Sequence, residues 1–149
     1  MATWQRFIEV LTDAFGTENV SVGRDGTKVS ATMDVPAEEG STQKRRQKVL
    51  FESDGKNMGW VAATSFIAAA EGLNISALLE QLGEEWRRPG AVNIGGQLAL
   101  RHHFSLIPYS DDSTENTKEQ LLKIAIGSAM VVGILADRFE EGLAEKDVR

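Results

Sequence analysis

One segment near the C-terminus constrains the fold more than any other part of this chain. Leu121–Ala136 carries a single charge, Lys123, and a helix over these residues is apolar on nearly every side. Such a helix has to be covered on more than one side. A sheet of the same domain can cover one side, and the other side then needs further helices or a second chain. The segment therefore predicts a long core helix in a protein that packs against other polypeptide.

Composition restricts the class of protein. The chain has 149 residues, without an internal repeat or a dividing linker, so we expect one domain over residues 1–149. The net charge of −6 argues against broad binding to nucleic acid or to an anionic membrane. Cysteine is absent, which excludes disulfides and thiolate metal sites. The start lacks the apolar core of a signal peptide, and Ile124–Ala136 is shorter than the roughly 20 residues of a membrane span. We expect a cytoplasmic protein without a membrane partner.

The apolar residues change their period along the chain. A helical stripe comes first and is followed by strict alternation, in which Val29, Ala31, Met33 and Val35 share one face. Alternation of this kind is typical of an antiparallel sheet with one buried and one wet face. Further strands are predicted around 20–22, 47–52, 91–94 and 97–106, and Trp60–Ala69 could be strand or helix. Helices are predicted near the N-terminus, over about 75–85 and over 117–143, where Thr117 and Gln120 form a capping box. The fold class is α+β: one antiparallel sheet of about five to six strands flanked by N-terminal, middle and long C-terminal helices.

The two histidines do not form a reactive group. Alternation along the predicted strand places His102 on the apolar face, and His103 on the other face. Adjacent strand residues point in opposite directions, so the pair cannot hold one metal ion. A core role for His102 is favoured, and a small-pocket enzyme near His102 is the alternative. We find no catalytic constellation and expect no enzyme, no cofactor and no metal.

One dense basic cluster could meet phosphates: Lys44, Arg45, Arg46 and Lys48. A solvated strand, whose charges discourage edge-to-edge aggregation, is favoured because the rest of the chain is acidic. A nucleic-acid-linked regulator using residues 44–48 is kept as an alternative, although a nucleic-acid partner is not expected. Docking of an acidic partner segment is a third interpretation.

Small residues recur every fourth position of the last helix, at Ala125, Ala129 and Gly133. Such a line lets another backbone come close. Packing on the sheet is the favoured interpretation, and a helix–helix seam in a dimer is the other. Trp60 and Trp86 stand near the ends of predicted elements, where each either covers the core or anchors a peptide.

A resemblance adds to these patterns. The hairpin Ala91–Leu106, the helix end Ile134–Glu140 with its Ala136-Asp137 pair, and the order of elements resemble the type III secretion chaperone-like fold. Within it the chain is similar to the YbjN-like family of small bacterial domains. The resemblance implies an α+β domain that forms homodimers and binds extended segments of partner proteins, as a chaperone or a regulatory adaptor. It implies no cofactor.

The sequence therefore predicts a non-enzymatic, homodimeric protein-binding domain. Its partner would be a protein or peptide segment that adds to a sheet edge or lies in a groove beside the first helix. The residues predicted for partner contact are Val49, Phe51 and Trp60. Those predicted for self-association are Leu78, Leu79 and Leu82.

Overall fold

The computed structural model describes residues 2–36, 44–55, 59–71, 74–83, 89–109 and 115–146. The elements are, in chain order, α1 (Ala2–Phe15), the 3-10 turn η1 (Thr17–Asn19), β1 (Val20–Val22), β2 (Lys28–Pro36), β3 (Lys44–Ser53), β4 (Trp60–Ala69), α2 (Ile75–Gly83), β5 (Gly90–Ile94), β6 (Gln97–Ser105), the 3-10 turn η2 (Ile107–Tyr109) and α3 (Glu115–Lys146). The strands form one antiparallel sheet in the order β1-β2-β3-β4-β6-β5. The predicted α+β class is confirmed.

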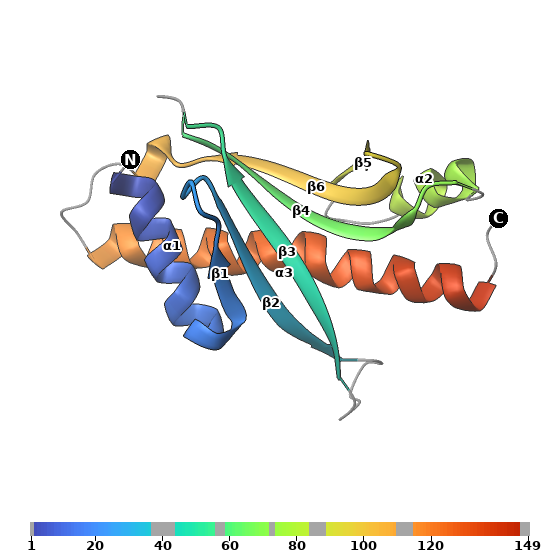
Figure 1. The fold of residues 1–149 in the computed structure, drawn as a ribbon, viewed down its shortest axis with the longest axis horizontal. Helices are drawn as coiled ribbons and strands as arrows, with labels where there is room; N and C mark the ends of the chain where they lie inside the picture. Colours follow the sequence, from blue (N-terminus) through green and yellow to red (C-terminus); the bar gives the residue numbers. More distant parts are fainter. Residues whose placement is uncertain are drawn as a thin grey trace.

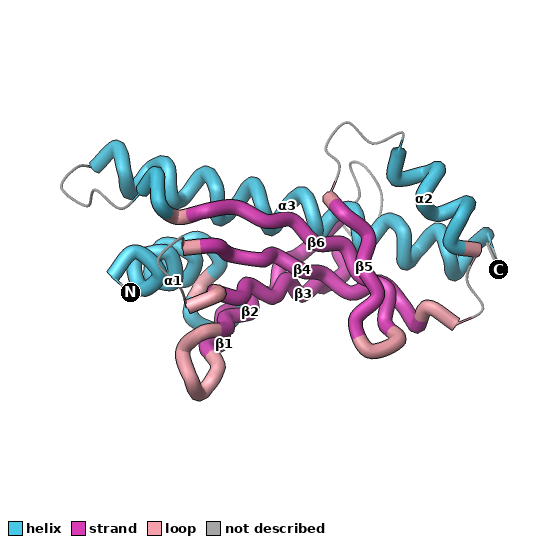
Figure 2. Tube along the Cα trace, turned by 90° about the horizontal axis from the view of Figure 1, so that it is seen from above, coloured by secondary structure: helices cyan, strands magenta, loops and turns pink. Residues whose placement is uncertain are grey.

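The molecule has two layers. The helix α3 runs along the whole sheet, and α1 lies beside its N-terminal half over β1 and β2 (Figure 1). The short helix α2 lies near the other end of α3 (Figure 2). All three helices lie on one side of the sheet (Figure 2), so within the described ranges the opposite side carries no helix. One sheet face is therefore part of the core and the other remains open.

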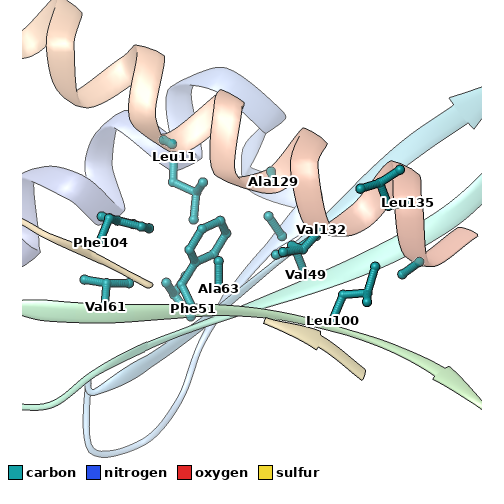
Figure 3. Packing of buried hydrophobic residues seen from close by; sticks show 14 of the residues in the cluster. Leu11, Val49, Phe51, Val61, Ala63, Leu100, Phe104, Ala129, Val132 and Leu135 are labelled. Atoms are coloured by element: carbon teal, nitrogen blue, oxygen red, sulfur yellow. The ribbon is translucent and has the colours of Figure 1, made fainter. Parts of the chain in front are cut away.

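The core fills the space between the helices and the sheet (Figure 3). The ring of Phe7 stands at its centre, 5.3 Å from the ring of Phe51 and 5.6 Å from that of Phe104, centroid to centroid. Trp4 stacks on Phe7, and its indole N–H donates to the Gly26 carbonyl of the β1–β2 turn at 2.6 Å. The predicted N-terminal stripe is thus the inner face of α1. Aromatic pairs in such offset and edge-on arrangements add to the stabilisation from their buried area.

The strand pattern follows the alternation of the sequence. Val29, Ala31 and Val35 of β2 are buried, as predicted. The ambiguous segment Trp60–Ala69 is strand throughout, because it pairs with β3 on one side and β6 on the other. At the β5–β6 turn Gly95 and its neighbour both have positive φ, 58° and 88°, as a two-residue hairpin turn requires.

The long helix differs from its prediction in two respects. It begins at Glu115, so Thr117 lies in its first turn and does not cap it. Thr117–Phe139 is also long and apolar enough to cross a membrane, judged by length and composition alone. The run Ile124–Ala136, from which the sequence prediction judged the length, is therefore only part of the apolar stretch. In the structure 44% of its most apolar window is buried inside the protein. This burial is compatible with a core helix of a soluble protein.

Candidate protein-binding surfaces

The line of small residues on α3 faces the sheet. Ala125 and Ala129 are 0% exposed, and a Cβ added to Gly133 would lie 2.8 Å from Sδ of Met33 and 3.0 Å from Cγ2 of Val49. Small side chains let the helix backbone approach the sheet this closely. The sheet-packing interpretation is confirmed, and these three residues form no exposed seam.

The residues predicted for partner contact divide between the two faces of the sheet. Val49 and Phe51 are 0% exposed, because odd-numbered residues of β3 point into the core (Figure 3). We therefore correct both to core residues. Trp60 is different, since its side chain is 45% exposed on the open side.

The residues predicted for self-association also divide. Leu78 and Leu82 are four apart on α2 and are buried, at 2% and 7% exposed. They belong to the core of the single chain, which corrects their assignment to a dimer interface. Leu79 is 51% exposed and lines a hollow of about 660 Å³ between α2 and the β5–β6 hairpin, together with Ile75.

The basic cluster is split by strand alternation. Arg45 points toward α3, where Nε donates to Oδ1 of Asp137 at 3.0 Å and an η-nitrogen donates to Oδ2 at 2.5 Å. Asp137 is 3% exposed, so this bidentate pair ties β3 to α3. Arg46 and Lys48 point to the open side, while the side chain of Lys44 lies outside the described part of the chain.

A surface that we call the open sheet face remains without cover. It consists of the outward residues of the central strands: Arg46, Lys48, Leu50, Glu52, Trp60, Ala62, Thr64, Phe66, Ala99, Arg101 and His103. Trp60 and Phe66 are 45% and 40% exposed, and both come from β4. Their spacing of six residues corresponds to about 20 Å along the strand. The open sheet face thus displays two aromatic rings on a rigid support.

The space between these two rings is occupied by short side chains and by Arg101. Ala62 is half-buried, while Thr64 and Ala99 are 1% and 0% exposed, because larger neighbours surround their short side chains. The hydroxyl of Thr64 accepts from Nε of Arg101 at 3.0 Å, which holds the guanidinium against the sheet. The face therefore carries an aromatic ring at each end, and the Arg101 side chain lies between them.

Charge on the open sheet face is mixed, with more basic than acidic side chains. Arg46, Lys48 and Arg101 lie on it, and Lys28 lies 3.7 Å from Glu52 at its margin. The Arg46 guanidinium lies 3.6 Å from the carboxylate of Asp34 and also donates to Oδ1 of Asn19 at 2.6 Å. Asp34 and Glu52 offset part of this charge, so the face keeps a small positive excess from Lys48 and Arg101 in a chain of net charge −6.

A smaller hollow of about 250 Å³ opens beside Trp60. Arg101 and His103 line it from β6, and Glu52 and Asp54 line it from the end of β3. The hollow is therefore polar on one side and aromatic on the other. It forms one end of the open sheet face.

The predicted orientation of the histidines is confirmed. His102 lies half-buried on the helix side with its ring 6.2 Å from that of Phe104, and His103 is exposed on the open face. Burial penalises the imidazolium and lowers the pKa of His102 below its usual value, and the charge of His103 acts in the same direction. In the described part of the chain no group of three or more His, Cys, Asp or Glu side chains could hold a metal ion.

Two features of this site escaped the sequence reasoning. Phe66 was not singled out, although its even spacing from Trp60 within one strand would have placed both rings on the same face. Arg101 was overlooked because a strand arginine is ordinary until its neighbours are known. Trp86, the other tryptophan predicted near an element end, lies outside the described residues.

Comparison with known proteins adds no assignment. No protein-family model matches the sequence, and no curated protein matches it.

Proposed function

We propose that this chain is a non-enzymatic protein-binding domain, a peptide-binding chaperone or regulatory adaptor that acts as a cytoplasmic homodimer. The observation that carries the proposal is the pair of exposed rings, Trp60 and Phe66, on a sheet face that no described helix covers. Aromatic residues dominate the energy of protein interfaces when a partner removes them from water. The resemblance to the type III secretion chaperone-like fold favours the same function, since that fold binds extended segments.

The geometry favours the open sheet face over a sheet edge as the docking surface. The edge strands are β1 and β5, with three and five residues, and short edges offer few backbone groups to an added strand. The open sheet face measures about 20 Å from Trp60 to Phe66, the length of about six extended residues. We expect an extended segment with two apolar anchors spaced to match the rings.

The charges suggest the composition of that segment. Arg46, Lys48 and Arg101 stand on the open sheet face, so acidic residues between the apolar anchors would find opposite charge. The proposed partner is therefore an acidic, apolar segment of another protein. Basic segments should be rejected by the same field.

Peptides selected from a random phage-displayed library provide the test. We expect the selected peptides to be rich in aromatic, aliphatic and acidic residues. Trp60→Ser and Phe66→Ser should each weaken the best peptide at least about tenfold, since buried aromatic anchors contribute 1 kcal/mol or more. Val22→Ser is the matched control, because Val22 is a 49% exposed strand residue on β1. Equal affinities of all three variants would exclude the open sheet face as the binding surface.

Single-stranded nucleic acid is a second candidate, because the same face combines aromatic rings with Lys48 and two arginines. Bases stack on exposed rings while basic side chains neutralise phosphates. Binding of this kind weakens steeply with salt. In 20 mM salt the Debye length is on the order of 20 Å, so charges are only weakly screened. A fluorescent oligothymidine that fails to bind under these conditions would exclude single-stranded nucleic acid as the partner. Binding that Trp60→Ser abolishes would support it.

A further inference from the structure

The arginines and the lysine of the open sheet face differ in what they contact within the described part of the chain. Arg46 lies 3.6 Å from the carboxylate of Asp34. Lys48 is exposed, and no hydrogen bond or ion pair to a described residue fixes it. Arg101 is half-buried, and its one hydrogen bond among the described residues runs from Nε to the Thr64 hydroxyl at 3.0 Å. Arg101 is therefore held in place while the hydrogens of its two η-nitrogens remain available.

Thr64 gives this arginine a defined direction. Thr64 lies on β4 and is 1% exposed, and its branched side chain has few rotamers. Arg101 lies opposite it on β6, so the hydrogen bond carries the guanidinium toward β4, the strand that bears both aromatic rings. A guanidinium whose Nε is engaged still presents its η-nitrogens, which match the two oxygens of a carboxylate. Arg101 thus forms a preoriented fork for an anion.

The register of the sheet locates this fork between the rings. Trp60, Thr64 and Phe66 are separated by even numbers of residues on β4 and share the open sheet face. At about 3.3 Å per residue, Thr64 lies about 13 Å from Trp60 and about 7 Å from Phe66. An extended segment has the same rise. A partner residue four places from the one on Trp60, and two places from the one on Phe66, therefore comes over the fork with its side chain toward the sheet.

The surroundings of Arg101 favour an anion of one charge. Glu52 and Asp54 line the hollow beside Trp60 that Arg101 also lines, and His103 stands next to them on β6. Lys28 lies 3.7 Å from Glu52 and offsets part of its charge. A phosphate group carries nearly two negative charges, so these two carboxylates would repel it more than they repel a carboxylate.

We propose that Arg101 is the specificity-determining residue of the open sheet face and binds the side-chain carboxylate of an Asp or Glu in the partner segment. This acidic residue lies two places from the partner residue on Phe66 and four places from the one on Trp60. The inference rests on the proposed function and specifies which sequence the face selects. The rings supply most of the affinity, and the fork supplies the discrimination. Thr64 is a positioning residue that acts through Arg101.

A series of synthetic peptides, measured by fluorescence anisotropy, tests the register. Each has phenylalanine at the first and seventh positions of its core, one glutamate between them and serine elsewhere. Because the two ends are alike, the peptide can bind in either direction, and glutamate at the third or the fifth position reaches Arg101. We expect these two peptides to bind about tenfold more tightly than their glutamine counterparts. Glutamate at the second, fourth or sixth position points away from the sheet and should change binding less than about threefold; an equal gain at all five positions would overturn the register.

A double-mutant cycle tests the contact itself. Arg101→Gln should weaken the tighter glutamate peptide about tenfold and change its glutamine counterpart less than about twofold. Arg46→Gln is the matched control, because Arg46 is an arginine of the same face that already has Asp34 beside it. It should affect both peptides alike. If Arg46→Gln abolishes the preference for glutamate and Arg101→Gln does not, the inference is overturned.

Two variants of Thr64 test the preoriented fork. Thr64→Val keeps the size of the side chain and removes the hydroxyl, so the preference for glutamate over glutamine should fall at least about threefold. The affinity for the glutamine peptide should stay the same, which a merely structural effect would not allow. Thr64→Ser keeps the hydroxyl and should keep the preference. An unchanged preference in Thr64→Val would overturn the positioning by Thr64.

Further outcomes separate this inference from the proposed function. Peptides whose binding depends on Trp60 and Phe66 but not on Arg101 would support the proposed function and overturn this inference alone. The same holds if the wild-type chain binds peptides selected from the library but no peptide of the series at about 1 mM. Failure to bind either set overturns both. Tighter binding of phosphoserine than of glutamate at the same position would assign Arg101 to phosphate and overturn the choice of a carboxylate.

Discussion

The orientation of α3 predicts opposite effects for the same substitution at two glycines of one helix. Gly127→Ala adds a methyl group in open space, whereas Gly133→Ala adds one within 3.0 Å of Cγ2 of Val49. Alanine is favoured over glycine inside a helix by about 1 kcal/mol at both positions. At Gly133 overpacking opposes this gain by typically 1–3 kcal/mol.

The flexibility of the neighbours sets the size of the effect. The Sδ atom of Met33, 2.8 Å from the added Cβ, ends a flexible side chain and can move at little cost. Val49 is branched at Cβ and fully buried, so it cannot rotate away. We therefore expect Gly127→Ala to raise the free energy of unfolding by up to about 1 kcal/mol. Gly133→Ala should be about 1–3 kcal/mol less stable than Gly127→Ala.

Urea unfolding followed by circular dichroism measures this difference, with the m-value checking that the exposed surface is unchanged. In thermal unfolding the two variants should melt roughly 2–12 °C apart, since 1 kcal/mol shifts a chain of this size by about 2–4 °C. The protein concentration has to be low and equal for the two variants, because self-association would make the apparent stability depend on concentration. Equal stability of the two variants, or a more stable Gly133→Ala, would refute the packing of α3 on β3.

Other variants test the buried pair, the half-buried histidine and the turn. In urea unfolding, Asp137→Ala should lower the free energy of unfolding by about 3 kcal/mol, because Arg45 loses its buried partner. The double variant Asp137→Leu with Arg45→Met should recover much of this loss, since neither charge then remains. Because the pKa of His102 is lowered, the folded state binds fewer protons than the unfolded state just below pH 6.5, and stability is lost as pH falls. The melting temperature of the wild-type chain should therefore fall between pH 7.5 and 5, and it should fall less in His102→Gln. The same fall in both proteins would contradict the burial of His102. Trp4→Phe should cost about 1–2 kcal/mol in thermal unfolding, since the Gly26 carbonyl loses its donor; a neutral result would show that water replaces the indole.

Some features of the site could be predicted from periodicity. The orientation of His102 against His103 and the strand faces of β2 follow from a period of two. The packing of Ala125, Ala129 and Gly133 was the favoured of two interpretations, because small residues four apart suit either a sheet or a helix. The sequence could not choose between them, since both partners demand the same small side chains.

Other features depended on the neighbouring strands. Val49 and Phe51 were assigned to a partner surface because the chain carries surplus apolar residues and no catalytic constellation. Only the register of β3 against β2 and β4 shows that odd residues face α3 and that Arg45 meets Asp137. On α2, Leu78 and Leu79 are equally apolar, and the direction of the helix decides that one is buried and the other exposed.

The amino-acid sequence by itself determined the α+β class, the antiparallel character of the sheet and the need to cover α3 on more than one side. These follow from local periods of hydrophobicity and from turn residues such as Gly95, which act within a few residues of the chain. Tertiary structure alone decided which apolar residues are left exposed, such as Trp60 and Phe66 on the open sheet face and Met130 on α3. A surface is what remains when all elements have packed, so it depends on contacts between residues far apart in the sequence, which no local pattern contains.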